Sequence, residues 1–241
     1  MGSLRARLLT ALALALAAAA ALEGVPALVA HIEAPGGREP DADQIGDFGR
    51  VPDFALVASS GRPVGRSDLA GFVWVASFIY TRCTESCPTQ SLHLARLQAE
   101  FREAPDLRLV SITVDPEQDT PEVLRRFGER YGADPDRWLL LTGDKRAIYC
   151  LAREGFRLGV TNPAAHEPIS CGAAGALPAT TLIRLLATPA WATHGSQGLI
   201  MHSARLALVD RGGRIRGYHL ATEPDSMERL PANLRRLLGE R

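Results

Sequence analysis

Lysine is nearly absent from this chain, and a net charge is absent altogether. Lys145 is the only lysine, and 27 basic side chains match 27 acidic ones. A chain without a net field has no general attraction for nucleic acid or acidic lipid, so we expect no nucleic-acid partner. Four cysteines in 241 residues are too few for a scaffold that depends on disulfides. A packed hydrophobic core must therefore stabilise the fold.

The amino terminus lacks an apolar run of full membrane-spanning length. The run over residues 8–22 has 15 residues, whereas a helix that crosses a bilayer needs about 20. Two arginines precede it, in the order of a secretory signal peptide. Residues 1–30 are predicted to be a signal peptide, with membrane attachment through residues 8–30 as the alternative. Both predict an exported protein, either periplasmic or anchored with its domain on the outer side of the inner membrane.

Residues 31–48 are polar and rich in proline and glycine, which predicts a flexible linker. Beyond it, residues 49–241 alternate between strand-like and helix-like patterns, with an irregular insert at about 161–200. Strands are expected in an early hairpin at 51–64, in buried runs at 72–80, 107–115 and 138–143, and in a late β-hairpin at 203–219. This order predicts an α/β fold, with a central mixed β-sheet and helices on both faces.

Local signals place the helices between these strands. Proline is tolerated in the first helical turn, so Pro88 indicates a helix start. Thr120 and Asp144 are expected to cap the next two helices, and residues 227–238 predict a final amphipathic helix. The first helix is expected to present four apolar side chains at helical spacing, namely Leu92, Ala95, Ala99 and Phe101.

A pair of cysteines stands where a buried strand meets that first helix. The stretch "YTRCTESCPT" places Cys83 and Cys87 four positions apart, directly before Pro88. Amide donors and the helix dipole at a helix amino terminus stabilise a thiolate, so a lowered pKa is expected for Cys87. Two converging sulfurs form either a disulfide or part of a site for Cu(I) or zinc. Spacing alone leaves a structural bridge, a redox couple and a metal site open.

Several ordered motifs over residues 50–220 resemble the Sco/SenC family, thioredoxin-fold copper chaperones that assemble the copper centre of respiratory oxidases. "FIYTRCTESCP" resembles the cysteine motif of that family, and "VSITVDPEQDTPEVL" resembles its strand and Asp-Thr-Pro segment. "LLLTGDKRAI" and "HSARLALVDRGGRIRGY" follow in the order of the family. The resemblance implies a thioredoxin-like domain and a copper-binding metallochaperone.

The resemblance also implies a ligand set for a copper ion, Cu(I) or Cu(II). Its members in this chain are Cys83, Cys87 and His202. Imidazole accepts both oxidation states, and a site with three protein ligands leaves a position open for transfer. The implied recipient is a copper-receiving subunit of a respiratory oxidase or another copper chaperone.

The remaining histidines and two acidic residues receive no functional role from the sequence. His93, His166 and His194 are interpreted as surface, packing or loop residues, and His219 is assigned no role. Asp115 and Asp119 are explained by turn formation and capping, although both lie close to the expected cysteine loop.

Cys150 and Cys171 stand apart from the motif. Within a helical pattern, Cys150 is most simply a small core residue. Cys171 lies in the insert, and a bridge between the two remains an alternative in an exported protein.

Two classes of enzyme are alternatives to the chaperone. A thiol-disulfide oxidoreductase would use Cys83 and Cys87 as catalytic residues, to reduce cysteines of a copper-receiving protein. Thioredoxin-like enzymes usually carry a cis-proline before the facing strand, whereas this chain has Met201-His202-Ser203 there. A peroxidase would need a proline motif before its cysteine that "SFIYTRCTESC" lacks. The metallochaperone is therefore the preferred prediction, with the oxidoreductase as its alternative.

Overall fold

The computed structural model describes residues 44–161, 171 and 201–240. Seven strands form one mixed sheet in the order β2-β1-β5-β4-β3-β8-β9, and β6 pairs with β7 in a separate two-stranded ribbon. The strands are β1 (Ala55–Ala58), β2 (Pro63–Gly65), β3 (Val73–Ile79), β4 (Leu107–Thr113), β5 (Trp138–Thr142), β6 (Val160–Thr161), β7 (Met201–His202), β8 (Arg205–Val209) and β9 (Ile215–Leu220). The predicted signal peptide or anchor, and all of the insert except its first residue and Cys171, lie outside the described residues.

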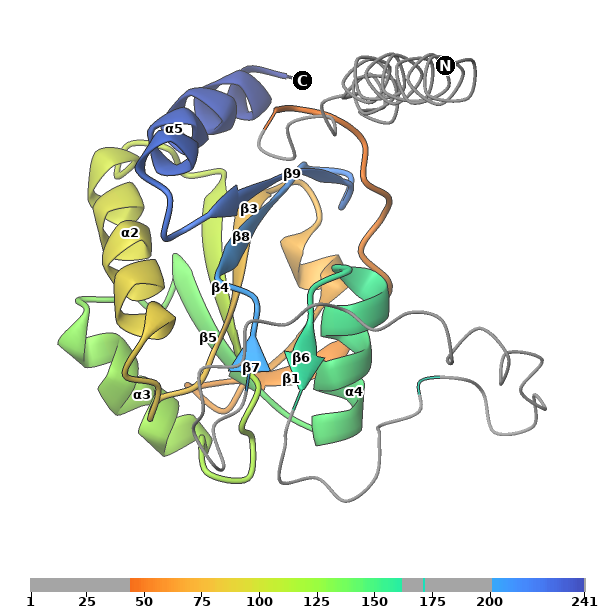
Figure 1. Ribbon diagram of the computed structural model, residues 1–241, viewed down its shortest axis with the longest axis vertical. Coiled ribbons are helices and arrows are strands. Elements are labelled where there is room, and N and C mark those ends of the chain that lie inside the picture. Colours follow the sequence, from red (N-terminus) through yellow and green to blue (C-terminus); the bar gives the residue numbers. More distant parts are fainter. Residues whose placement is uncertain (1–43, 162–170, 172–200, 241) are drawn as a thin grey trace, which may run out of the picture. The chain divides into compact units, whose positions relative to one another are not determined.

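Helices cover both faces of this sheet (Figure 1). They are η1 (Arg66–Leu69), α2 (Ser86–Glu100), α3 (Pro121–Arg130), α4 (Lys145–Cys150), the π-helical turn η2 (Leu151–Gly155) and α5 (Pro224–Gly239). The helices α2, α3 and α5 lie on one side of the sheet and α4 on the other. None of the described helices is both long enough and apolar enough to traverse a bilayer.

The centre of the sheet is parallel and its two margins are antiparallel. β3 pairs with β4, and β4 with β5, in parallel register, which requires the helical crossovers that the sequence predicts. β8 runs antiparallel to β3, β9 to β8, and β1 to both β2 and β5. The predicted mixed sheet and both predicted hairpins are confirmed.

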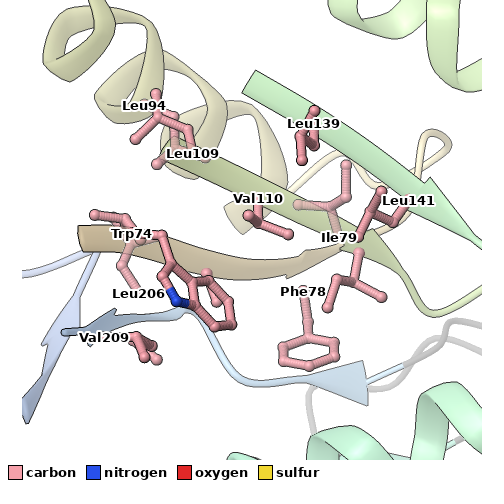
Figure 2. Close-up of a cluster of buried hydrophobic side chains, with 14 of the residues drawn as sticks. Trp74, Phe78, Ile79, Leu94, Leu109, Val110, Leu139, Leu141, Leu206 and Val209 are labelled. Carbon is pink, nitrogen blue, oxygen red and sulfur yellow. The ribbon is translucent and has the colours of Figure 1, made fainter. Parts of the chain in front are cut away.

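Two hydrophobic layers enclose the fully buried strand β3. On one side, the rings of Trp74 and Phe78 pack edge-on against Phe156, at centroid distances of 5.9 and 5.3 Å. Figure 2 shows these two rings of β3 on one side of the sheet and Leu94 of α2, next to Leu109, on the other. The double burial explains why β3 reads as an unbroken apolar run.

The predicted helix caps are present. Thr120 Oγ1 accepts a hydrogen bond of 3.3 Å from the Val123 amide, and Asp144 Oδ1 accepts one of 2.8 Å from the Ala147 amide. Each bond satisfies an amide that has no partner within the first helical turn.

The predicted face of α2 is half correct: Phe101 is buried and Ala95 packs against the core, whereas Leu92 and Ala99 are exposed. Leu92 is 50% exposed, and the buried side chains of the helix are Cys87, Gln90, Ser91, Leu94 and Leu97. Cys87, at the start of the helix, belongs to this buried stripe and is itself fully buried. Leu92 lies five residues later, about 140° around the axis, and therefore faces solvent.

Cys150 is joined to Cys171 by a disulfide, with a Cα–Cα distance of 5.4 Å. The simplest reading of Cys150 as a small core residue is therefore wrong, and the alternative of a bridge is correct. Cys150 is only partly buried at the end of α4, where its sulfur can meet a residue from the insert.

Candidate functional site

The loop between β3 and α2 positions the cysteine pair. Cys83 follows the strand end by four residues, and its amide donates to the Tyr80 carbonyl at 3.1 Å. Cys87 is the second residue of α2, so its sulfur lies at the helix amino terminus as predicted. Cys87 is fully buried, whereas Cys83 is partly exposed. The sulfur of Cys87 therefore belongs to the core, whereas Cys83 is the residue of the pair that solvent reaches.

Both residues are thiols, and they share a side-chain hydrogen bond. That bond and burial raise the pKa of Cys87 far above its usual range, although a backbone hydrogen bond with Tyr80 opposes the shift. The lowered pKa expected from the helix terminus is therefore wrong for this residue, because the hydrogen bond with Cys83 and then burial both raise the pKa. A soft cation would have to displace the proton that Cys87 retains.

Tyr80 adds a third polar group to the cysteine pair. Its side chain is 6% exposed. Burial, followed by the charge of Cys83 and a hydrogen bond with it, raises the pKa of the phenol. Tyr80 therefore stays a neutral hydrogen-bond donor beside the sulfur of Cys83.

Asp119 holds the cysteine loop against the neighbouring strand. Its buried carboxylate accepts hydrogen bonds from the Thr81 amide at 3.0 Å and from the Thr81 hydroxyl at 2.5 Å. It also accepts one from the Thr113 hydroxyl at 2.5 Å. Since Thr81 is two residues before Cys83, this carboxylate fixes the path of the chain into the cysteine motif.

Asp115 contributes a second anchor to the same loop. Its carboxylate is buried, and it forms a 2.8 Å ion pair with Arg82, whose side chain is 67% exposed. Turn formation and capping are thus an incomplete account of Asp115 and Asp119. The signal available in the sequence was their position after β4, because parallel pairing with β3 brings the two strand ends together.

His202 lies three residues before β8, the antiparallel neighbour of the strand that leads into the cysteine loop. The pairing of β3 with β8 ends at Ala76 and Ala207, so it does not extend to His202. The backbone of His202 itself pairs with Val160 in the β6–β7 ribbon. Figure 1 shows β7 and the segment that leaves β4 at the same end of the sheet. The side chain of His202 lies outside the described part of the structure.

The other histidines lie away from the cysteine pair or outside the described residues. His93 lines a groove of about 300 Å³ between α2 and α5. His219 is buried, where its Nδ1 donates to the Ser226 carbonyl at 2.8 Å and its Nε2 accepts from Asn233 at 3.3 Å. The absence of a role for His219 at the site is consistent with these bonds. His166 and His194 fall within the part that the structure does not describe.

Among the described side chains, no three of His, Cys, Asp and Glu converge into a complete metal site. The pair of thiols is nevertheless chemically suited to a soft cation, since two thiolates favour Cu(I) or zinc over calcium and magnesium. It is equally suited to closing into a disulfide, because the sulfurs are already within hydrogen-bonding reach. Geometry alone therefore permits both metal binding and dithiol chemistry.

Known proteins are similar to this chain in sequence and in fold. The chain is 34% identical over 121 residues to the SCO1 protein homolog of Bacillus subtilis, and the match covers 49% of this chain and 63% of that relative. A SCO1/SenC family lipoprotein from Bacillus anthracis is 26% identical, with a TM-score of 0.60 over 78% of this chain and 94% of that one.

ScoI of Bradyrhizobium japonicum, solved with copper bound, has a TM-score of 0.56 over 78% of this chain and 99% of that chain. At 23% identity it supports the fold alone, which is a thioredoxin-like α/β fold with a mixed sheet, as predicted. A family model described as SCO1/SenC matches residues 42–173, more than half of the 241. The chain belongs to the SCO1/SenC family.

Proposed function

We propose that this protein is a copper chaperone that delivers copper to the copper centre of a respiratory oxidase. Cys83 and Cys87 bind the ion through their sulfurs, and His202 completes the site through its imidazole. The observation that carries the proposal is the pair of hydrogen-bonded thiols at the mouth of α2. The family supports it, because related proteins are described as cytochrome c oxidase assembly proteins or were solved with copper bound.

The two sulfurs have different parts in this function. Cys87 is buried at the helix start and provides a fixed ligand, whereas the partly exposed Cys83 is accessible to the ligands of a recipient. Loading releases thiol protons to solvent, because the thiolate is the metal-binding form. Transfer then proceeds by ligand exchange from the exposed side. No covalent intermediate with the recipient is needed.

His202 is proposed as the third ligand on two grounds. It occupies the position that the resemblance to the family implies, and it lies three residues before β8, the antiparallel neighbour of the strand that leads into the cysteine loop. A site with two thiolates and one imidazole has a ligand position open to the recipient.

The second candidate is a thiol-disulfide oxidoreductase that reduces cysteines of the copper-receiving protein. The same hydrogen-bonded thiols support it, since their oxidation to a disulfide would supply the two electrons that reduce a partner disulfide. A solved Sco protein is described as having a disulfide switch. The raised pKa of buried Cys87 leaves Cys83 as the sulfur placed to attack.

Copper binding is tested on the purified domain by metal analysis after anaerobic loading with Cu(I). We expect about one copper per chain in the wild type and none retained by Cys83→Ser or Cys87→Ser. The matched control is the double variant Cys150→Ser/Cys171→Ser, which removes two cysteines distant in sequence from the motif and should bind copper like the wild type. Retention of one copper by Cys87→Ser would contradict the assignment.

The third ligand and the rival function need separate measurements. His202→Ala should weaken Cu(I) binding by more than about 10-fold, while His93→Ala should leave it unchanged. An insulin-disulfide assay with copper-free protein tests the oxidoreductase. Rapid turnover in that assay, together with unaltered copper binding by His202→Ala, would favour the enzyme over the chaperone.

The setting of the protein is part of the proposal. Residues 1–30 are proposed to export the chain, either as a cleaved signal peptide or as an anchor over residues 8–30, and the predicted linker at 31–48 to tether the domain. The last residues of that linker belong to the fold, since the amides of Gly46 and Phe48 donate to backbone carbonyls of β9 at 2.8 and 2.9 Å. A lipoprotein among the structural relatives agrees with a domain held at the outer side of the inner membrane. The recipient is proposed to be an oxidase subunit or another copper chaperone.

A further inference from the structure

A glutamine beside the cysteine pair is buried without hydrogen bonds. Gln90 has no exposed surface, and neither its Oε1 nor its Nε2 has a hydrogen-bond partner among the residues that the structure describes. Burying an amide without partners costs free energy, and native interiors rarely contain one without a reason. Packing alone does not explain the choice, because leucine or methionine would fill the same space at no such cost.

The same helix contains a glutamine with ordinary bonding. Gln98, eight residues further along α2, donates from Nε2 to the Gly132 carbonyl at 2.8 Å and accepts from the Asp134 amide at 2.9 Å. Its role in fixing the neighbouring loop is clear from these bonds. Gln90 therefore differs in its environment and not in its chemistry.

The position of Gln90 on the helix directs it toward the cysteine site. It follows Cys87 by three residues, so the two side chains are neighbours on one helix face, with Cβ atoms about 5–6 Å apart. Long side chains in a helix lean toward its amino terminus and cover the preceding turn. For Gln90 the preceding turn is the one that contains Cys87, and both residues belong to the buried stripe of α2.

We propose that Gln90 is a positioning residue for the copper site, whose amide N–H donates to the Cys87 sulfur when copper is bound. The Cys87 side chain has no exposed surface, so its sulfur is enclosed by the core. Because thiolate is the form that binds metal, a copper-bound Cys87 is a charged acceptor inside that core, and the thiol proton leaves to solvent on loading. A buried donor is then required, and the unpartnered amide supplies it. This inference rests on the proposed copper-binding function.

The test compares Gln90→Met with Gln98→Met, the same change on the same helix. Copper-free stability is measured by chemical denaturation, and Cu(I) affinity by competition with bicinchoninate. Gln90→Met should be as stable as the wild type or more stable, and should bind Cu(I) about 10-fold more weakly. It should also shift the sulfur-to-Cu(II) charge-transfer band of the Cu(II)-loaded protein. Gln98→Met should lose stability and keep both copper properties.

Each outcome decides a different question. If Gln90→Met and a second variant, Gln90→Leu, bind copper and absorb light like the wild type, the positioning role is refuted while the chaperone proposal stands. If they lose stability without any change in the copper readouts, Gln90 is purely structural. Failure of the wild type to bind copper would overturn the proposed function, and this inference with it.

Discussion

Replacing Asp119 by asparagine keeps the shape of this buried side chain and removes its charge. The carboxylate accepts three hydrogen bonds, two from Thr81 and one from Thr113. An amide in the same orientation can keep all three, with its oxygen toward the Thr81 amide and the Thr113 hydroxyl and its nitrogen toward the Thr81 hydroxyl. The variant therefore measures the loss of charge assistance with little change in packing.

The magnitude follows from these bonds. A hydrogen bond to a charged group contributes about 1.5–3 kcal/mol and a neutral one about 0.5–1.5. Replacing three hydrogen bonds to a charged group by three neutral ones predicts a loss of about 3 kcal/mol in the free energy of unfolding. Asp119→Ala leaves three hydrogen-bond donors without an acceptor and should lower the free energy of unfolding by more, about 3–6 kcal/mol. A domain of ordinary stability, about 5–15 kcal/mol, still folds with asparagine.

Urea denaturation of the copper-free domain measures this loss, and competition for Cu(I) measures its consequence at the site. Because Thr81 leads into the cysteine motif, Asp119→Asn should also weaken Cu(I) binding about 10-fold. Asp53→Asn is the matched control: Asp53 pairs with Arg66 at the surface, where its side chain is 84% exposed, and should cost under about 1 kcal/mol. Equal stability and equal copper affinity in wild type and Asp119→Asn would refute the anchoring role.

Three further predictions concern the rest of the domain. Removing the Cys150–Cys171 disulfide, which closes a 21-residue separation, should cost about 3 kcal/mol in denaturant titrations through the entropy of the unfolded chain; an unchanged midpoint would contradict it. Phe156→Ala removes a ring that is fully buried between two aromatic neighbours and should lower the free energy of unfolding by about 3–5 kcal/mol. Unfolding monitored by fluorescence measures this loss, and a clearly smaller loss would contradict the prediction. Burial, and then the charge of Arg96, lowers the pKa of His93 below its usual 6.5, so the unfolded state binds the extra proton and stability should fall as pH drops below about 6.5. A His93→Gln variant should flatten that part of the pH profile.

The strands and caps were predictable because their signals are local. β3 reads as a strand from its own apolar run, and the Thr120 and Asp144 caps follow from single residues at helix starts. The face of α2 was not predictable in this way. Leu92 is apolar and lies at helical spacing, yet the helix buries the stripe of Cys87, Leu94 and Leu97 instead, a choice that depends on tertiary contacts.

The cysteine pair of the candidate site was predictable from the sequence, whereas the residues that support it were not. The cysteines and the resemblance to a known family identified Cys83 and Cys87 from the sequence. The role of Asp119 depends on the meeting of two loops 38 residues apart, which only the parallel register of β3 and β4 creates. The raised pKa of Cys87 likewise depends on its hydrogen bond with Cys83 and on its burial, for which a helix-start motif contains no signal. The ligand role of His202 stays a prediction.

This domain contains one disulfide, Cys150–Cys171, and one pair of thiols, Cys83 and Cys87, and the combination affects how the protein should be handled. A thiol titration of the folded chain should detect Cys83 readily and the buried Cys87 only slowly, whereas denaturation without a reductant should raise the count to two thiols of the four cysteines. Thiol reductants added to keep Cys83 and Cys87 reduced would also reduce the Cys150–Cys171 disulfide. They would compete for the metal through their own sulfurs as well. Ascorbate under an inert atmosphere avoids both problems.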